Sequence, residues 1–108
     1  MALQVAALSF EVIENLRPLV ARIRRHDRSL ADQLMRAATS VALNIAEGDV
    51  SEAGNQRSRF FTAAGSANES LAALRVAIAW GYLGADEAGD AAQLLGRVLA
   101  MLRKLARR

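Results

Sequence analysis

Residues 32–48, with the sequence DQLMRAATSVALNIAEG, decide the fold of this chain, because they combine two neighbouring stripes with the periodicity of an α-helix. Apolar side chains recur at steps of three and four residues, which places them on one face of a helix. These apolar residues are Leu30, Leu34, Ala37, Val41 and Ile45. The polar stripe beside them contains Gln33, Arg36, Ser40, Asn44 and Glu47. The apolar face is predicted to turn toward a core, and the polar stripe requires a polar partner.

The same stretch resembles the signature of a known family, the small four-helix-bundle proteins called 23S rRNA intervening-sequence proteins. A second block is similar to that family's other common segment. It contains Arg59, Phe60, Phe61, Ala64, Gly65, Ser66, Ala67 and Glu69, followed by Trp80, Gly81, Tyr82 and Leu83. The resemblance implies a bundle that assembles into a homopentamer, but no common activity, since the family is named after inserts in bacterial rRNA genes. Its relatives include accessory proteins of the reverse transcriptases in diversity-generating retroelements.

The composition predicts one cytoplasmic domain spanning residues 1–108, because a chain of this length can bury one core without metals or disulfides. Cysteine is absent, which excludes disulfides and thiolate metal sites. No apolar run approaches the roughly 20 residues of a membrane span, so no membrane partner is expected. The net charge is +3, and thirteen arginines stand against one lysine. Guanidinium groups suit bidentate binding of phosphate, although an alanine- and arginine-rich composition is also typical of a high-GC genome.

Alanine and leucine are the dominant residues of the sequence, which therefore predicts four helices joined by short turns. The predicted helices cover residues 2–25, 30–48 and 56–82, with a fourth starting at Asp86 or Glu87, and residues 49–55 form a loop. Pro18 predicts a kink or a short break, because proline removes an amide donor. Ser29 is the predicted N-cap of the second helix, with Asp32 in the capping-box position. Short connections favour an all-α, up-down-up-down antiparallel four-helix bundle.

Each remaining helix carries an apolar stripe that is predicted to face the core. In the first helix it contains Val5, Val12, Ile13, Leu16, Val20 and Ile23; in the third, Phe60, Ala64, Ala67, Leu71, Leu74 and Ile78; in the fourth, Leu94, Leu95, Val98, Leu102 and Leu105. A second apolar set on the third helix contains Phe61, Ala72, Val76, Ala79 and Leu83. This helix therefore has either a wide core face or a face covered by another subunit. An alanine-rich core is thin, which favours a homo-oligomer.

Polar residues on the third helix repeat the spacing seen in residues 32–48. They are Asn55, Arg59, Thr62, Ser66 and Glu69. An antiparallel register predicts four pairs, namely Arg36 with Glu69, Ser40 with Ser66, Asn44 with Thr62, and Glu47 with Arg59. A helical wheel places the third-helix stripe nearly opposite the apolar face, which predicts contacts between subunits. We interpret the network of Gln33, Arg36, Ser40, Asn44, Glu47, Arg59, Ser66 and Glu69 as fixing register or assembly. The alternative is a ligand pocket lined by Arg36, Asn44, Glu47 and Glu69.

No residue pattern predicts catalysis, a metal or a cofactor. Bundle metal sites use a Glu-x-x-His spacing, and the single histidine, His26, lies in a predicted turn without such a glutamate. Gly-rich phosphate loops, nucleophile elbows and Cys-His pairs are also missing from the sequence. The sequence therefore predicts a protein that is not an enzyme.

Basic residues gather near helix ends and are the candidates for nucleic-acid or partner binding. They are Arg22, Arg24, Arg25 and Arg28 near the first turn, Arg57 and Arg59 at the start of the third helix, and Arg103, Lys104, Arg107 and Arg108 at the C-terminus. In a pentamer the last two groups would form a basic ring that binds phosphate backbones with little sequence preference. The alternative is that these cations only complement the helix macrodipole.

Aromatic residues for stacking on bases are scarce, because Phe60 and Phe61 are both predicted to be internal. Trp80 and Tyr82 are predicted to plug one end of the bundle, with an interface role as the alternative. The leading hypothesis is a non-enzymatic homo-oligomeric scaffold that contacts RNA or DNA, or a nucleic-acid enzyme such as a reverse transcriptase, through basic ends. The alternatives are an assembly protein without a nucleic-acid partner and a bundle that binds a small molecule.

Overall fold

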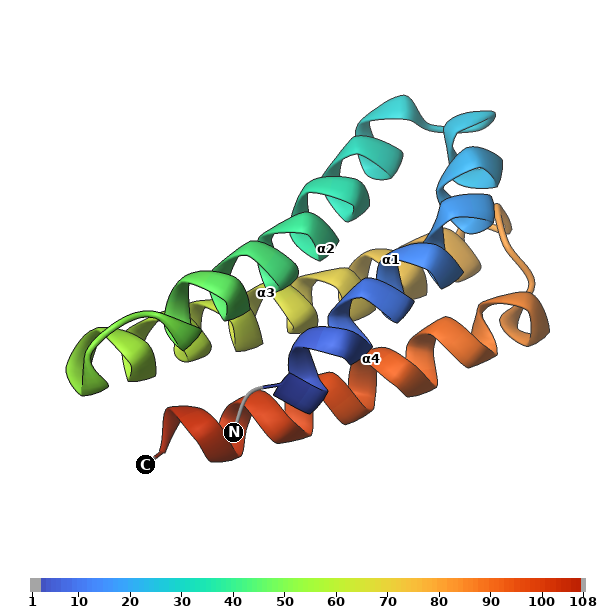
Figure 1. The fold of residues 1–108 in the computed structure, drawn as a ribbon. Coiled ribbons are helices and arrows are strands. Elements are labelled where there is room, and N and C mark those ends of the chain that lie inside the picture. Colours follow the sequence, from blue (N-terminus) through green and yellow to red (C-terminus); the bar gives the residue numbers. More distant parts are fainter. Residues whose placement is uncertain (1–2, 108) are drawn as a thin grey trace.

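Four helices account for nearly all of residues 3–107, the part of the chain that this computed structural model describes. They are α1 (Leu3–Arg24), α2 (Arg28–Asp49), α3 (Ala53–Ala79) and α4 (Ala85–Ala106). Each helix packs against its neighbours in sequence, and α4 closes the ring against α1 (Figure 1). The start of α1, the end of α4 and the α2–α3 connection lie at one end of the bundle, and the other two connections lie at the opposite end. The predicted up-down-up-down bundle is confirmed, and no helix within residues 3–107 could span a membrane.

The apolar stripes meet in one core, whose largest fully buried side chains are Phe60, Ile23, Leu34, Ile45, Leu74, Leu95 and Leu102. The stripe predicted for α1 is slightly misplaced, because Leu8 and Leu19 are buried while Ile13 and Val20 are only half-buried. Ile13 and Val20 instead line a groove between α1 and α2, so the buried face of α1 is rotated away from the predicted one. Small residues line much of the α3 face, which lets neighbouring helices approach closely.

The helix α1 runs without a break through Pro18, so the predicted interruption is wrong. Pro18 is exposed, and so is Glu14, whose carbonyl loses its helical partner to the proline ring. A carbonyl on the solvent side can bond to water instead, so this proline does not end the helix.

The helix α2 begins at Arg28 and is capped by Asp27, not by Ser29 as predicted. Asp27 has an extended backbone, and its carboxylate accepts a hydrogen bond from the Leu30 N–H at 2.9 Å. The Asp27 N–H already bonds to the Ile23 carbonyl at 2.8 Å, which places this residue between the two helices. Asp32, which was predicted in the capping-box position, instead forms an ion pair with Arg24. The distance between its carboxylate and the guanidinium is 2.6 Å, and the pair links the end of α1 to α2.

The Arg24–Asp32 pair predicts a loss of stability in acid. The hydrogen bond from Arg24 lowers the pKa of Asp32 below its ordinary value of 3.8. A carboxyl whose pKa is lowered by folding stabilises the fold above its unfolded pKa, and this contribution disappears as the pH falls through the folded value. Asp32→Asn is therefore expected to be less stable than the wild type at pH 7, with a gap that closes below pH 3.8. Urea unfolding across this pH range measures the difference in the free energy of unfolding. A difference that does not change with pH would contradict the role of the Arg24–Asp32 pair. Arg24→Gln should lose a similar amount of stability at pH 7.

The helix α3 starts three residues earlier and ends three residues earlier than predicted, which leaves only residues 50–52 between α2 and α3. Its C-terminus is set by Gly81, which has a φ of 80°. The Gly81 N–H donates to the Ile78 carbonyl and the Tyr82 N–H donates to the Ala77 carbonyl, both at 2.9 Å. This is the Schellman arrangement, in which a left-handed residue satisfies the last carbonyls of a helix.

The helices α2 and α3 approach each other closely at Gly48, near the end of α2. A Cβ added to Gly48 would lie 2.5 Å from Cε1 of Phe60. The Phe60 side chain is 2% exposed, so its ring occupies the place that a side chain at residue 48 would need. The glycine in the Ala-Glu-Gly sequence at 46–48 is therefore required by the packing of Phe60.

Candidate functional site

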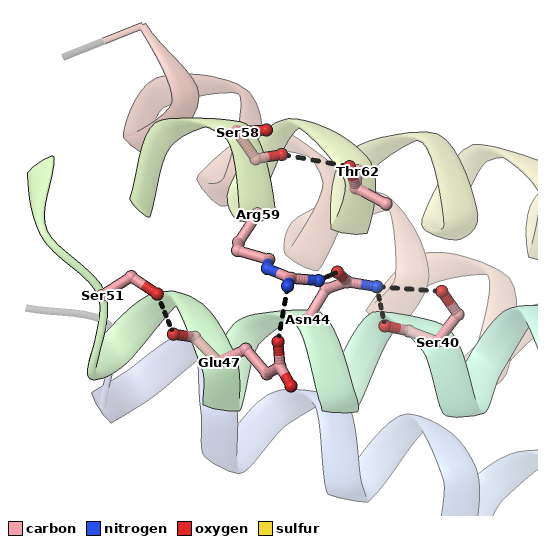
Figure 2. Close-up of polar contacts among 7 residues, drawn as sticks. All are labelled: Ser40, Asn44, Glu47, Ser51, Ser58, Arg59 and Thr62. Carbon is pink, nitrogen blue, oxygen red and sulfur yellow. Dashed lines mark hydrogen bonds and ion pairs between the residues drawn. The ribbon is translucent and has the colours of Figure 1, made fainter. Parts of the chain in front are cut away.

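The polar rows of α2 and α3 form a ladder within the chain. The Ser40 and Ser66 hydroxyls are hydrogen-bonded at 2.8 Å, and the Arg59 guanidinium pairs with the Glu47 carboxylate at 2.9 Å. Both pairs are the ones that the antiparallel register predicts. Figure 2 shows Arg59 reaching from α3 toward Asn44 and Glu47 on α2.

Asn44 is the centre of this ladder, and its predicted pairing with Thr62 is wrong. Its amide nitrogen donates to the Ser40 carbonyl at 2.9 Å and to the Ser40 hydroxyl at 3.1 Å. Its amide oxygen accepts from Arg59 at 3.4 Å. Thr62 instead donates to the Ser58 carbonyl of its own helix at 3.1 Å (Figure 2). The amide of Asn44 is thus occupied by nearer partners than Thr62.

The expectation that these contacts need a second subunit is also wrong, because the ladder closes inside one chain. The α3 face toward α2 is made of small buried residues, which the predicted apolar stripe left out. These are Ala63, Ser70, Ala73 and Ala77. They shift the core face of α3 toward α2, so that Arg59 and Ser66, each one turn before a member of this set, lie on the flank that α2 covers. The ladder therefore fixes the register of the two helices.

Arg36 and Glu69, the fourth predicted pair, line a shallow hollow of about 460 Å³ together with Ser29, Asp32 and Gln33. Within residues 4–107 they form no ion pair. The ligand-pocket alternative requires Arg36 and Glu69 to share one cavity with Asn44 and Glu47, and neither of the last two lines this hollow. Nor do His, Asp or Glu residues of this region gather into a group that could hold a metal.

The arginines at the α1–α2 end are largely balanced by carboxylates. Arg22 pairs with Glu87 at the start of α4 at 3.2 Å, and Arg24 pairs with Asp32. Five arginines (Arg22, Arg24, Arg25, Arg28 and Arg75) lie at this end with four acids, namely Asp27, Asp32, Asp86 and Glu87. Arg25 and Arg28 are exposed. This end of the bundle therefore carries little net charge.

The opposite end holds two acids, Asp49 and Glu52, and four cations that we call the tail cluster: Arg57, Arg103, Lys104 and Arg107. Figure 1 places the start of α3 and the end of α4 at this same end. All four side chains are exposed, and none forms an ion pair with another described residue. Arg59 lies nearby, but it is paired with Glu47. Arg108 was also a candidate and lies outside the described residues.

Phe61 is 73% exposed, which contradicts the prediction that it is internal. It lines a groove of about 520 Å³ between α3 and α4, together with Ala64, Gly65, Asn68, Leu99, Arg103, Ala106 and Arg107. The reason is geometric: neighbouring helical residues point about 100° apart. Because Phe60 fills the core space above Gly48, Phe61 is turned out toward the α4 edge. An exposed aromatic ring therefore lies beside two members of the tail cluster.

At the other end of α3, Tyr82 and Leu83 close the bundle but Trp80 does not. Tyr82 is half-buried and stacks on His26 with a centroid separation of 4.9 Å. Leu83 is buried, whereas Trp80 is 70% exposed and stacks on Tyr82 with a centroid separation of 6.4 Å. The predicted plug is therefore wrong for Trp80, since Tyr82 and Leu83 already fill the available space.

A second groove, of about 330 Å³, separates α1 from α2 and is mainly apolar. Its lining consists of Ile13, Leu16, Arg17, Val20, Met35, Ala38 and Thr39. Phe10 on α1, and Met35 and Leu43 on α2, are exposed large hydrophobic residues.

The second apolar set predicted on the third helix is also largely exposed. Ala72, Val76 and Ala79 lie on the surface of α3, so the interpretation of this set as part of a wide core face is wrong.

Comparisons with known proteins identify a family and a fold. The family model described as 23S rRNA-intervening sequence protein matches residues 1–104. The chain is also similar to a crystal structure of a protein of unknown function from the S23 ribosomal protein family of Bacteroides thetaiotaomicron VPI-5482. The sequence identity is 18%, the TM-score is 0.88, and the match covers 96% of this chain and 99% of the other. At this identity the likeness shows the fold alone. A comparison with curated proteins found no match.

Proposed function

Because this chain belongs to the 23S rRNA-intervening sequence protein family, we propose that it is a non-enzymatic, homo-oligomeric helical scaffold. It contacts nucleic acid, or an enzyme that works on nucleic acid such as a reverse transcriptase, through one basic end of the bundle. The observation that supports this proposal is the tail cluster of Arg57, Arg103, Lys104 and Arg107 at one end of the bundle. All four side chains are exposed, and none forms an ion pair with another described residue.

Unpaired guanidinium and ammonium groups are suited to phosphate backbones, because each phosphate contact releases a condensed counterion. The opposite end is a poorer candidate, since Arg22 and Arg24 are already paired with carboxylates. Contacts of this kind give binding with little sequence preference. Repetition of the tail cluster around an oligomer would increase the number of phosphates that one particle contacts.

Self-association is supported by the apolar surface of α1 and α2. Met35 is exposed and lines the apolar groove, and Phe10 and Leu43 are exposed on the same two helices. Large exposed apolar patches are rare on soluble monomers. Much of the core consists of alanine, so burial of this surface against a second copy would add apolar contacts that one chain lacks. We therefore place the contact between copies on the α1–α2 face.

The self-association predicts that Met35→Lys reduces the mass of the particle. A lysine in the centre of the α1–α2 face would have to be desolvated in the assembly, which is costly without a partner charge. Sedimentation velocity is expected to give a multiple of 11.6 kDa for the wild type and a smaller mass for Met35→Lys. Ala100→Lys, at an exposed position of α4, is the matched control and should leave the mass unchanged. A wild type that sediments as a monomer at all concentrations contradicts this part of the proposal.

Binding of the wild type to an RNA duplex at low ionic strength tests the nucleic-acid part of the proposal. Fluorescence anisotropy of a labelled duplex is expected to rise on addition of protein. If no binding occurs at low salt, the tail cluster only solvates the surface, and the alternative of an assembly protein without a nucleic-acid partner is favoured.

A further inference from the structure

The groove between α3 and α4 combines an exposed aromatic ring with two guanidinium groups. We propose that this groove is a subsite for single-stranded nucleic acid, in which a base stacks on Phe61 while Arg103 and Arg107 bind the flanking phosphates. This inference rests on the proposed function, because it assigns a form of nucleic acid to the same basic end.

The exposure of Phe61 is the first observation. Its neighbour Phe60 is 2% exposed, whereas Phe61 is 73% exposed in the middle of a well-formed helix. Every nucleobase has a π-face, so an exposed phenyl ring can stack on any of them. Stacking therefore provides contact area for Phe61 without sequence readout.

The shape of the groove next to Phe61 is the second observation. Gly65 follows Phe61 by one helical turn, and a Cβ added there would meet nothing within 4 Å. The absence of a side chain leaves open space on α3 beside the ring, in a groove of about 520 Å³. Asn68, one turn further, lines the same groove with an amide that can donate to and accept from the edge of a base.

The charge of the groove selects its occupant. Arg103 and Arg107 line it, and none of the eight lining residues is a carboxylate. An apolar helix of a second copy would leave both guanidinium groups without partners, whereas a phosphate backbone satisfies them. The α1–α2 groove has one arginine and a mainly apolar lining, which is better suited to a second copy. A single strand is favoured over a duplex, because only unstacked bases can reach an aromatic ring.

The substitution Phe61→Leu tests this subsite, since leucine keeps an apolar side chain but has no π-face. The probes are labelled oligouridylate, oligothymidylate and an RNA duplex of the same length, measured by anisotropy at low salt. Affinity for both single strands is expected to fall about tenfold, in line with the roughly 1–3 kcal/mol of one base–aromatic stack. Duplex affinity and particle mass should remain unchanged. Phe61→Tyr should retain single-strand binding, and Trp80→Leu, which removes an exposed ring at the far end of α3, should have no effect.

Three results would overturn the subsite. If Phe61→Leu weakens duplex and single strands equally, the ring supports the structure and is not a stacking platform. If it lowers the particle mass, the groove is covered by a second copy. If it leaves all affinities unchanged while the wild type binds RNA, the proposed function stands without this subsite. Failure of the proposed function is a different outcome, in which the wild type binds neither the duplex nor the single strands.

Discussion

Reversing Arg103, Lys104 and Arg107 to glutamate is expected to weaken binding to an RNA duplex by about 100-fold or more at low salt. Each of these cations contributes roughly one phosphate contact, so the slope of log K against log salt should become flatter by about three. The loss is expected to be uniform across RNA sequences, because the contacts go to the backbone. Anisotropy titrations at several salt concentrations measure both quantities.

The matched control is the triple reversal of Arg25, Arg28 and Arg75, which changes the net charge by the same amount. Arg25 and Arg28 lie at the opposite end, where carboxylates balance the arginines, and Arg75 is exposed in the last two turns of α3. This variant should lose little affinity. Equal losses in both triple variants contradict a role for the tail cluster, since they would indicate that only the net charge matters. Circular dichroism and sedimentation of both variants check that the bundle and its assembly are intact.

Gly48→Ala is expected to destabilise the fold by about 1–3 kcal/mol, the usual range for an overpacked core. The new Cβ would lie 2.5 Å from Cε1 of Phe60 and 2.9 Å from its Cδ1, so either the ring or the helix must move. The ring is buried in the core and cannot swing into solvent. Alanine is favoured over glycine by about 1 kcal/mol inside a helix, so a net loss shows that the steric clash is the larger effect. Urea unfolding gives the free-energy difference directly.

Gly96→Ala is the control for this prediction, because Gly96 lies inside α4 and a Cβ there meets nothing within 4 Å. That variant should be more stable than the wild type by up to about 1 kcal/mol. Combining Gly48→Ala with Phe60→Leu should cost less than the sum of the two single changes, because the smaller side chain removes the clash. A Gly48→Ala protein as stable as the wild type would show that α2 and α3 do not approach as closely as described.

The fold could be predicted from the sequence because its signals are periodic and local. The three-four spacing of apolar residues placed all four helices. The charges at the ends of the polar stripes predicted the Glu47–Arg59 pair, which forms at 2.9 Å, and the Arg36–Glu69 pair, which does not form within the described residues. Choices between equivalent neighbours could not be predicted in this way. Asp27 and Ser29 are both good N-caps, and Asp27 is selected by its backbone bond to Ile23.

The candidate site could be predicted only in part, since much of it depends on contacts distant in sequence. The basic residues near helix ends are visible in the sequence, but the pairing of Arg22 with Glu87 joins α1 to α4 and has no local signal. The exposure of Phe61 also depends on a contact between residues that are distant in sequence. Phe60 faces the core, and Phe61 does not, because the Phe60 ring fills the space next to Gly48 on α2.

The role of the tail cluster in binding nucleic acid is tested by the salt dependence of duplex RNA binding, measured for the wild-type protein and for the Arg103, Lys104 and Arg107 triple variant. We expect log K for the wild type to fall linearly and steeply with log salt, and the triple variant to bind weakly with a flatter slope. A wild type that fails to bind RNA even at low salt, or that binds with an affinity indifferent to salt, would contradict it.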